Sequence, residues 1–325
     1  MLVSKTESFD IIVVGGGTAG CVIASRLSEN TSLRILLLEA GSDNNNDPKV
    51  LTPLRSFEML GDATYDWNYR TSPQQCANGR IFNQTRGRML GGSSAINSNS
   101  LVYPNEAMFD TWAEIVGDEI WSWREMKPLL RKFQTVQPDP DGAQPGQLDD
   151  VQTVSKGPIQ ASYPRKRNRL HLAWEETFKS LDCFHPGDGA DSSVIGGVTT
   201  TNAIDARGEK GERSHAGDSY ISMVRGCENL TIKTETQIEK LALEALSDST
   251  EIQVTGVYYY SDGQRVFAKA EREVVLCAGV FGSPQLLELS GIGDEEILRR
   301  AGVPCLVNLP NVGGKSTDIL TESKR

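Results

Sequence analysis

The segment FDIIVVGGGTAG, at residues 9–20, restricts the fold more than any other part of the sequence. A run of β-branched and apolar residues leads into Gly15, Gly17 and Gly20, which have GxGxxG spacing and open a helix-like segment. In such a turn the first glycine allows a tight bend, the second lets the backbone approach a pyrophosphate, and the third lets helix and strand pack closely. The N-terminus of the helix also offers unpaired N–H groups to phosphate. The pattern predicts a strand–turn–helix unit that binds an adenine dinucleotide.

A second apolar strand is expected at residues 34–38, and Glu39 follows it. The change from strand to helix to strand predicts a parallel α/β sheet. An acidic residue at this distance from the glycines accepts hydrogen bonds from ribose hydroxyls and disfavours a 2′-phosphate, so NADP is not expected. The motif alone does not distinguish NAD from FAD.

Composition excludes several classes of protein. The net charge of −10 and the pI near 5.0 argue against nucleic-acid binding, which needs a basic surface. No segment approaches the ~20 consecutive apolar residues of a membrane span. The first residues lack a signal-peptide pattern, which predicts a cytoplasmic location. The six cysteines form no CxxC pair and are expected to be free, buried thiols rather than disulfides or metal ligands.

The segment GRMLGGSSAIN, at residues 87–97, is the second informative pattern. A Gly-Gly pair followed by Ser93 and Ser94 lets backbone and hydroxyl donors lie against a flat or anionic ligand. A glycine-rich turn held by two serine side chains would have the same residues. The segment alone leaves both interpretations open.

This segment and AGVFGSPQLLELSGIG, at residues 278–293, resemble the two signature segments of the glucose-methanol-choline (GMC) family of flavoprotein oxidoreductases. YDWNYRT at 65–71, WSWREMKPLLRKFQ at 121–134 and GERSHAGDSYI at 211–221 are also similar to this family. The resemblance runs in order along the chain as far as Gly313. It implies that the dinucleotide is FAD.

The resemblance also implies roles for individual residues. It assigns Thr18 and Ala19 to the pyrophosphate, Glu39 to the adenosine ribose and the backbone of Ile238 to the adenine. It assigns Leu90 to Ser93, together with Asn97, to the flavin side of the site. Together, the motif and the resemblance predict these cofactor-binding residues: Gly15, Gly17, Thr18, Ala19, Gly20, Glu39, Ala40, Leu90, Gly91, Gly92, Ser93, Asn97 and Ile238. Some family members attach FAD through a histidine near the position of Ile96, and isoleucine has no such nucleophile. Non-covalent FAD is therefore expected.

The resemblance implies an α/β fold with a Rossmann-like FAD-binding domain of GMC type and an incomplete α+β substrate domain. We expect a discontinuous FAD-binding domain at 1–100 and 216–313, a cap and partial substrate domain at 101–215, and a divergent tail at 314–325. Patterning predicts helices at 18–29, 106–116, 124–133 and 171–182, and further strands at 229–233, 252–260, 265–269 and 273–277. Residues 137–150 are expected to be a flexible linker.

Members of the family oxidise alcohols by hydride transfer to FAD, with a histidine from the C-terminal half as the base. The resemblance therefore implies oxidation of a small-molecule alcohol (a CH–OH donor), with a place in secondary metabolism. The chain has three histidines, His171, His185 and His215, and none stands where the family has its base. No catalytic residue and no metal ligand is predicted.

The family pattern stops after Gly313, and residues 314–325 do not follow it. We expect a truncation at this point, through a splice form or a gene-model error. The alternative function is a truncated, non-catalytic member that binds FAD without turnover, and a third is lyase chemistry in the same pocket. A homo-oligomer and a completing partner chain both stay open.

Overall fold

The structure is a computed structural model that describes residues 3, 5–130, 132–137, 156–165, 168–185, 196–246 and 251–314. The expected linker, apart from Gln137, and the expected tail, apart from Gly314, lie outside these residues. The chain divides into two compact units. The first comprises Met1–Asn44, Gly61–Ser93 and Ile221–Arg325, and the second comprises Asn45–Leu60 and Ser94–Tyr220. Residues 45–60 thus group with the second unit, although they lie within the stretch 1–100 expected for the FAD-binding domain.

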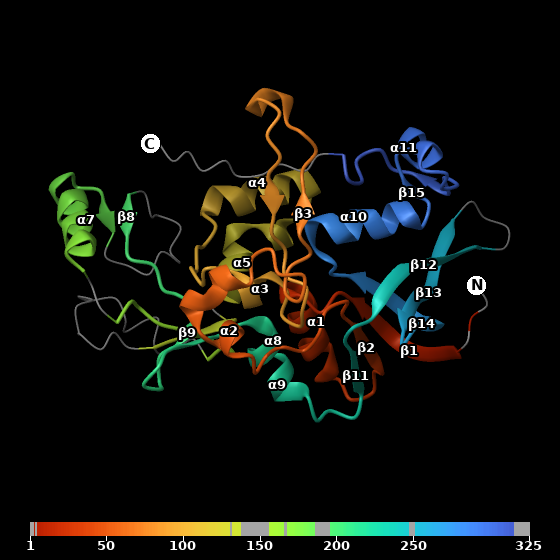
Figure 1. The fold of residues 1–325 in the computed structure, drawn as a ribbon, viewed down its shortest axis with the longest axis horizontal. Coiled ribbons are helices and arrows are strands. Elements are labelled where there is room, and N and C mark those ends of the chain that lie inside the picture. Colours follow the sequence, from red (N-terminus) through yellow and green to blue (C-terminus); the bar gives the residue numbers. More distant parts are fainter. Residues whose placement is uncertain are drawn as a thin grey trace. The chain divides into compact units, whose positions relative to one another are not determined.

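A six-stranded sheet forms the centre of the first unit, with the strand order β11-β2-β1-β14-β13-β12 (Figure 1). Strands β11, β2, β1 and β14 are parallel, and β14, β13 and β12 form an antiparallel meander. The strands are β1 Lys5–Val14, β2 Ile35–Leu38, β11 Leu230–Lys233, β12 Gln237–Ala245, β13 Ile252–Ser261 and β14 Gln264–Leu276. The predicted α/β fold with a Rossmann-like parallel sheet is confirmed.

Apolar side chains on the parallel strands form the core of this unit. All four residues of β2 are buried, as are Ile12 and Val14 of β1, and Tyr259 of β13 packs into the same cluster. Burial of each such side chain contributes about 1.5–3 kcal/mol, which explains why a short, fully apolar strand lies at this position.

Two helices flank the sheet and bear on the site. Helix α1 (Thr18–Ser28) turns small residues, among them Cys21 and Ala24, inward and so packs closely on the sheet. Helix α10 (Gly279–Leu289) follows β14, and Ser290, at its end, accepts a hydrogen bond from the Leu241 N–H of β12 at 2.9 Å. The remaining elements of the unit are β3 Tyr69–Arg70, η2 Gln75–Ala77, β4 Asn83–Gln84, α9 Ile221–Val224, β15 Ile292–Gly293, α11 Glu295–Arg300 and β16 Val307–Asn308.

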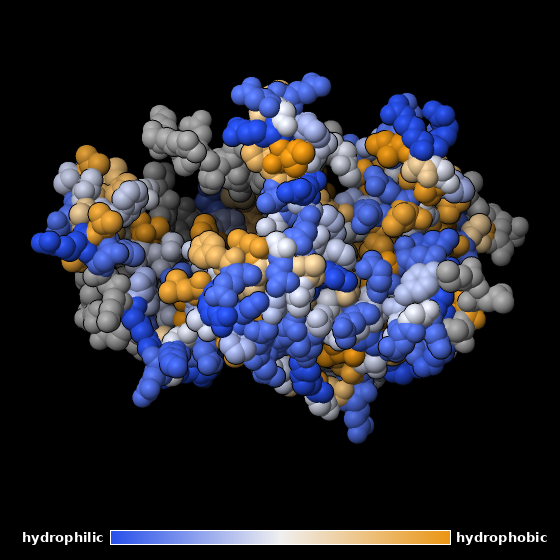
Figure 2. All heavy atoms as spheres, in the orientation of Figure 1, coloured by the Kyte–Doolittle hydropathy of each residue, from blue (hydrophilic) through white to orange (hydrophobic). Residues whose placement is uncertain are grey.

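The second unit consists of helices and short strand pairs. Its elements are α2 Pro48–Leu51, η1 Pro53–Glu58, α4 Glu106–Val116, η3 Glu119–Trp121, α5 Trp123–Leu130, β5 Gln134–Val136, β6 Ile159–Ala161, α7 Arg169–Ser180, β7 Phe184–His185, β8 Gly197–Val198, β9 Ile204–Asp205, β10 Glu212–Arg213 and α8 Ala216–Ser219. Apolar residues lie on the surface over α7 (Figure 2), where Leu170 and Trp174 are exposed. Along the sequence, the division between the two units falls within helix α3 (Ser93–Ile96), after Ser93.

Three expectations about local structure need correction. Residues 265–269 and 273–277 belong to one continuous strand, β14, rather than to two strands. Strand β12 was not expected at all. The six cysteines, all within the described residues, are free, but Cys76 and Cys183 are exposed and only Cys21 is fully buried.

Among the described residues, no helix has both the length and the apolarity that a bilayer crossing requires.

Candidate functional site

The turn between β1 and α1 needs glycine at two positions for packing. Gly15 has φ +100°, and a Cβ there would lie 2.5 Å from the carbonyl oxygen of Cys277. A Cβ on Gly20 would lie 1.8 Å from the carbonyl oxygen of Gly15. Gly17 is different, because a Cβ there would meet only Gly92 and Cys277, at ordinary contact distance. Gly17 precedes α1 without a side-chain cap, so the first N–H groups of the helix are left for a ligand.

Glu39 follows β2 and is almost completely buried. Its two carboxylate oxygens accept hydrogen bonds from the backbone N–H groups of Gly16 and Gly41, each at 2.8 Å. Burial raises the pKa of Glu39 to about 7, although these two N–H groups oppose the shift. Counting the Ala40 N–H, three backbone donors act on this carboxylate, which leaves one of its four lone-pair sites for a further donor, such as a ribose hydroxyl.

The glycine-rich segment at residues 87–93 packs directly on the β1–α1 turn. The Gly91 N–H donates to the Gly16 carbonyl oxygen at 2.7 Å, and the Gly87 N–H donates to Ser93 Oγ at 3.1 Å. A Cβ on Gly92 would lie 2.7 Å from the Cα of Gly17. Two glycine motifs far apart in the sequence therefore form one surface.

A cavity of about 760 Å³ opens beside this surface, and all of its lining residues belong to the first unit. Its size falls within the range of small-molecule and cofactor sites. Most of the predicted cofactor-binding residues line it, namely Gly15, Gly17, Thr18, Ala19, Glu39, Ala40, Gly92, Ser93 and Ile238.

The other predicted residues lie elsewhere. Gly20, Leu90 and Gly91 do not line the described cavity; they are buried and pack against the β1–α1 turn at Gly15 and Gly16. Asn97 belongs to the second unit, where its side-chain oxygen accepts a hydrogen bond from Arg213 at 2.8 Å. The sequence offered no signal for this contact.

Arg213 is one of the largest buried side chains of the second unit. Its guanidinium donates to the carbonyl oxygens of Val50 and Ser94, at 3.1 and 3.3 Å, besides the Asn97 side chain. Burial lowers its pKa to about 10. Three chain segments are held together by this one side chain.

Aromatic residues that the sequence analysis did not select line another wall of the cavity. Trp67 and Tyr69 stack with ring centroids 5.8 Å apart, and Phe281 tilts against Tyr69 at 5.2 Å. Burial raises the pKa of Tyr69. Trp67 and Tyr69 come from the YDWNYRT segment, whose resemblance to the family could have identified them.

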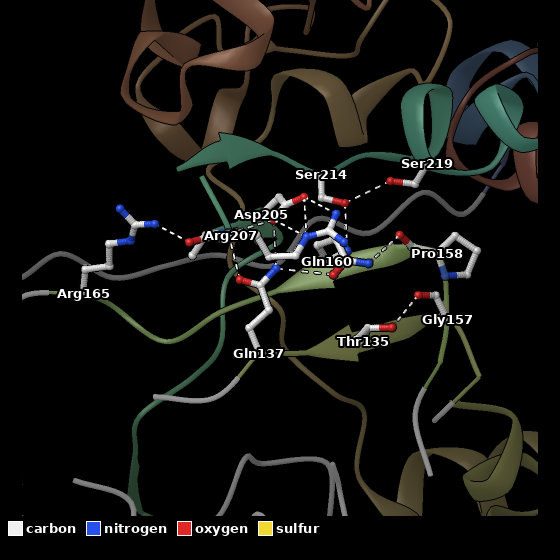
Figure 3. A network of polar contacts seen from close by, with 11 residues as sticks. Thr135, Gln137, Gly157, Pro158, Gln160, Arg165, Asp205, Arg207, Ser214 and Ser219 are labelled. Atoms are coloured by element: carbon white, nitrogen blue, oxygen red, sulfur yellow. Dashed lines mark hydrogen bonds and ion pairs between the residues drawn. The ribbon is translucent and has the colours of Figure 1, made fainter. Parts of the chain in front are cut away.

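A polar network in the second unit has a structural explanation (Figure 3). Gln137 donates to Asp205 and Gln160, Arg207 pairs with Asp205, and Ser214 Oγ accepts from the Gln160 N–H. The hydrogen bond from Arg207 lowers the pKa of Asp205 to about 2. Because these side chains form hydrogen bonds and an ion pair with one another, we interpret the network as stabilising the loops rather than as a ligand site.

The histidines add little to the site. His171 lies in the first turn of α7, where its N–H donates to the capping side chain of Asn168. His215 is buried and precedes α8. His185 ends β7, and its side chain lies outside the described part of the chain.

The parallel sheet, the glycine turn and the buried acid define an α/β protein with an adenine-dinucleotide site. The donors and the open backbone at Gly17 fit a pyrophosphate, and the cavity has the apolar walls that a flavin needs. The family model described as GMC oxidoreductase matches residues 9–317, and the chain belongs to this family. The predicted family and its FAD cofactor are confirmed.

Individual relatives agree with this assignment. The chain is 38% identical to dehydrogenase mpl7 of Monascus purpureus over 94% of its own length and 49% of that protein. It is 33% identical to pyranose dehydrogenase of Agaricus xanthodermus, over 96% and 51%. The crystal structure of pyridoxine 4-oxidase from Mesorbium loti matches with a TM-score of 0.81 at 32% identity, over 93% of this chain and 55% of that one. The chain spans about half the length of the curated relatives it matches.

Proposed function

We propose that the chain binds FAD non-covalently in the cavity of the first unit. The observation that carries this proposal is the joining of the β1–α1 turn, Glu39 and the 87–93 segment around one cavity. Thr18 and Ala19 would hold the pyrophosphate, Glu39 the ribose, Ile238 the adenine, and Gly92 with Ser93 would border the flavin.

We further propose that the enzyme oxidises an alcohol to a carbonyl compound. Bound FAD would accept the hydride from the CH–OH carbon. The residues of this chain would orient the cofactor: Gly17 and Gly92 would let it approach the backbone closely, and apolar side chains of α10 would line its pocket. Support comes from the family and from relatives named as pyranose dehydrogenase and choline dehydrogenase. A role in secondary metabolism is part of the same proposal.

Non-covalent binding rests on Ile96. This side chain is buried and has no nucleophilic atom that could attach the cofactor. Acid denaturation of the purified protein should release all of the flavin into the supernatant. Flavin that stays with the precipitated chain would contradict this part of the proposal.

The proposal is tested by the visible absorbance spectrum of the purified chain, before and after anaerobic addition of a primary aromatic alcohol. Flavin bands that bleach support both binding and alcohol oxidation. Bands that persist with a panel of alcohols favour the second candidate, a chain that binds FAD without turnover. A folded chain without flavin bands, even after incubation with FAD, would contradict the cofactor proposal.

The second candidate, a chain that binds FAD without turnover, is favoured by one observation: neither His171 nor His215, the histidines whose side chains the structure describes, lines the cavity. Lyase chemistry would be recognised by product analysis without net flavin reduction. A homo-oligomer or a completing partner chain would appear in the mass measured by light scattering. The cytoplasmic location is likewise a proposal, which imaging of a tagged chain would test.

A further inference from the structure

We propose that Arg86 supplies the positive charge that binds the pyrophosphate of the dinucleotide. The inference rests on the proposed FAD site and adds a residue that neither the glycine motif nor the resemblance assigned. Arg86 lines the same cavity as Thr18 and Ala19, at the N-terminus of α1.

The backbone of Arg86 is held in place on both sides. Its N–H donates to Asp66 Oδ1 at 3.0 Å, and its carbonyl oxygen accepts from the Trp67 N–H at 2.9 Å. Asp66 is itself almost fully buried. These two hydrogen bonds therefore hold the backbone of Arg86 in place in the wall of the cavity.

The guanidinium of Arg86 is oriented but has no anionic partner. It lies over the ring of Phe281, 5.1 Å from the ring centroid, and one terminal nitrogen donates to the Thr85 carbonyl oxygen at 2.6 Å. No carboxylate pairs with it among the residues that the structure describes. Other arginines of this unit do have such partners, for example Arg225 with Asp43 and Arg265 with Glu239.

The charges around the cavity show what this guanidinium would bind. Among the residues described as lining the cavity, Glu39 is the only acidic residue and Arg86 the only basic one. FAD brings a pyrophosphate with two negative charges, and the β1–α1 turn offers it only N–H groups and the helix dipole. Arg86 provides the matching cation, in the planar form that suits phosphate oxygens.

Arg86 also lies within reach of the turn. Gly87 packs on Gly92, since a Cβ on Gly87 would lie 2.3 Å from the Gly92 carbonyl carbon, and Gly92 packs on Gly17. Through Gly87 and Gly92, the backbone next to Arg86 thus packs on the turn that precedes α1, and Arg86, Thr18 and Ala19 line the same cavity.

Arg80 is a matched control. It lies over Phe82 at 5.3 Å from the ring centroid, in the same segment and with the same kind of ring contact. Unlike Arg86, it is exposed and does not line the cavity. A change at Arg80 therefore removes an equivalent cation–π contact without touching the site.

The experiment is a titration of the wild-type chain and the variants R86Q, R86K and R80Q with FAD, followed by flavin fluorescence at low and high salt. Competition by ADP, which keeps the pyrophosphate but lacks the flavin, is measured in parallel. We expect R86Q to raise the Kd for both ligands about ten- to hundredfold and to weaken their salt dependence. R86K should fall between R86Q and wild type, and R80Q should match wild type.

Each contrary result has a distinct meaning. If R86Q binds FAD as tightly as wild type, the assignment of Arg86 is wrong. A loss of affinity in R86Q with unchanged salt dependence would mean that Arg86 acts by packing on Phe281, which also overturns it. If the folded wild-type chain itself binds no FAD, the proposed function fails, and the inference falls with it.

Discussion

At the scale of single residues, Gly92 packs closely on Gly17 at the turn before α1. Gly92 has φ +52°, and a Cβ there would lie 2.7 Å from the Cα of Gly17. Backbone strain and steric overlap therefore act at the same position.

We predict that Gly92→Ala lowers the free energy of unfolding by about 1–3 kcal/mol and weakens FAD binding at least tenfold. Gly79→Ala is the control, since Gly79 has φ +72° but no atom within 4 Å of a Cβ. Urea denaturation and FAD titration of both variants measure the effects. Equal FAD affinity in the two variants would show that the Gly17–Gly92 contact does not shape the site.

The raised pKa of the single residue Glu39 predicts that the stability of the protein depends on pH. A carboxyl whose pKa rises on folding, here from 4.5 to about 7, binds its proton more tightly in the folded state. The stability of the ligand-free protein should therefore fall between about pH 4.5 and 7, by on the order of 3 kcal/mol. Urea denaturation of wild type and Glu39→Gln across this range tests it. A variant with the wild-type pH slope would show that Glu39 does not titrate as proposed.

At the scale of elements, a polar cluster ties strands β1, β11 and β13 together. Glu7 of β1 pairs with Lys233 of β11 at 2.6 Å and accepts a hydrogen bond from the Tyr259 hydroxyl of β13 at 2.9 Å. Burial alone would raise the pKa of Glu7, but hydrogen bonds from Lys233, Lys5 and Tyr259 bring it down to about 2. The ionised carboxylate therefore stabilises the fold.

We predict that Glu7→Gln destabilises the protein by about 1 kcal/mol above pH 4.5. The difference from wild type should shrink as the pH falls towards 2, because wild-type Glu7 is then protonated as well. Thr6→Ser, a change at an exposed residue of the same strand, serves as control. A difference that stays constant with pH would assign the effect to packing instead of charge.

The elements also show what the sequence could predict. The strand–turn–helix unit was recoverable because β2 and the last four residues of β1 are apolar and the glycines mark the turn. Strand β12 was not, because its sequence QIEKLALEA is rich in helix formers, and only its pairing with β13 makes it a strand. Glu39 could be predicted because it stands at the expected distance in sequence after the glycine motif. The hydrogen bond between Arg213 and Asn97 could not, because it joins residues far apart in the sequence that only the tertiary fold brings together.

At the scale of the whole molecule, the second unit exposes much apolar surface. Met108, Trp112 and Ile115 of α4 are all more than half exposed, and Ile120 and Trp121 of η3 lie exposed nearby in the sequence. Apolar surface of this kind favours association.

We predict that Trp112→Ser together with Ile115→Ser raises the monomeric fraction of the purified chain severalfold. Thr111→Ser together with Glu114→Ser, on the same helix, should not. Size-exclusion chromatography with light scattering measures both. Association that is equal in the two double variants would show that α4 plays no part in it.

The position of Gly15 against Cys277 has a consequence for biosynthesis. Gly15 belongs to the turn between β1 and α1, whereas Cys277 directly follows β14, so a ribosome must translate past β14 before the residue opposite Gly15 exists. A nascent chain that contains the glycine motif but not yet β14 therefore lacks part of the residues that line the cavity. On the proposed FAD site, the cofactor can therefore bind only after β14 has been synthesised.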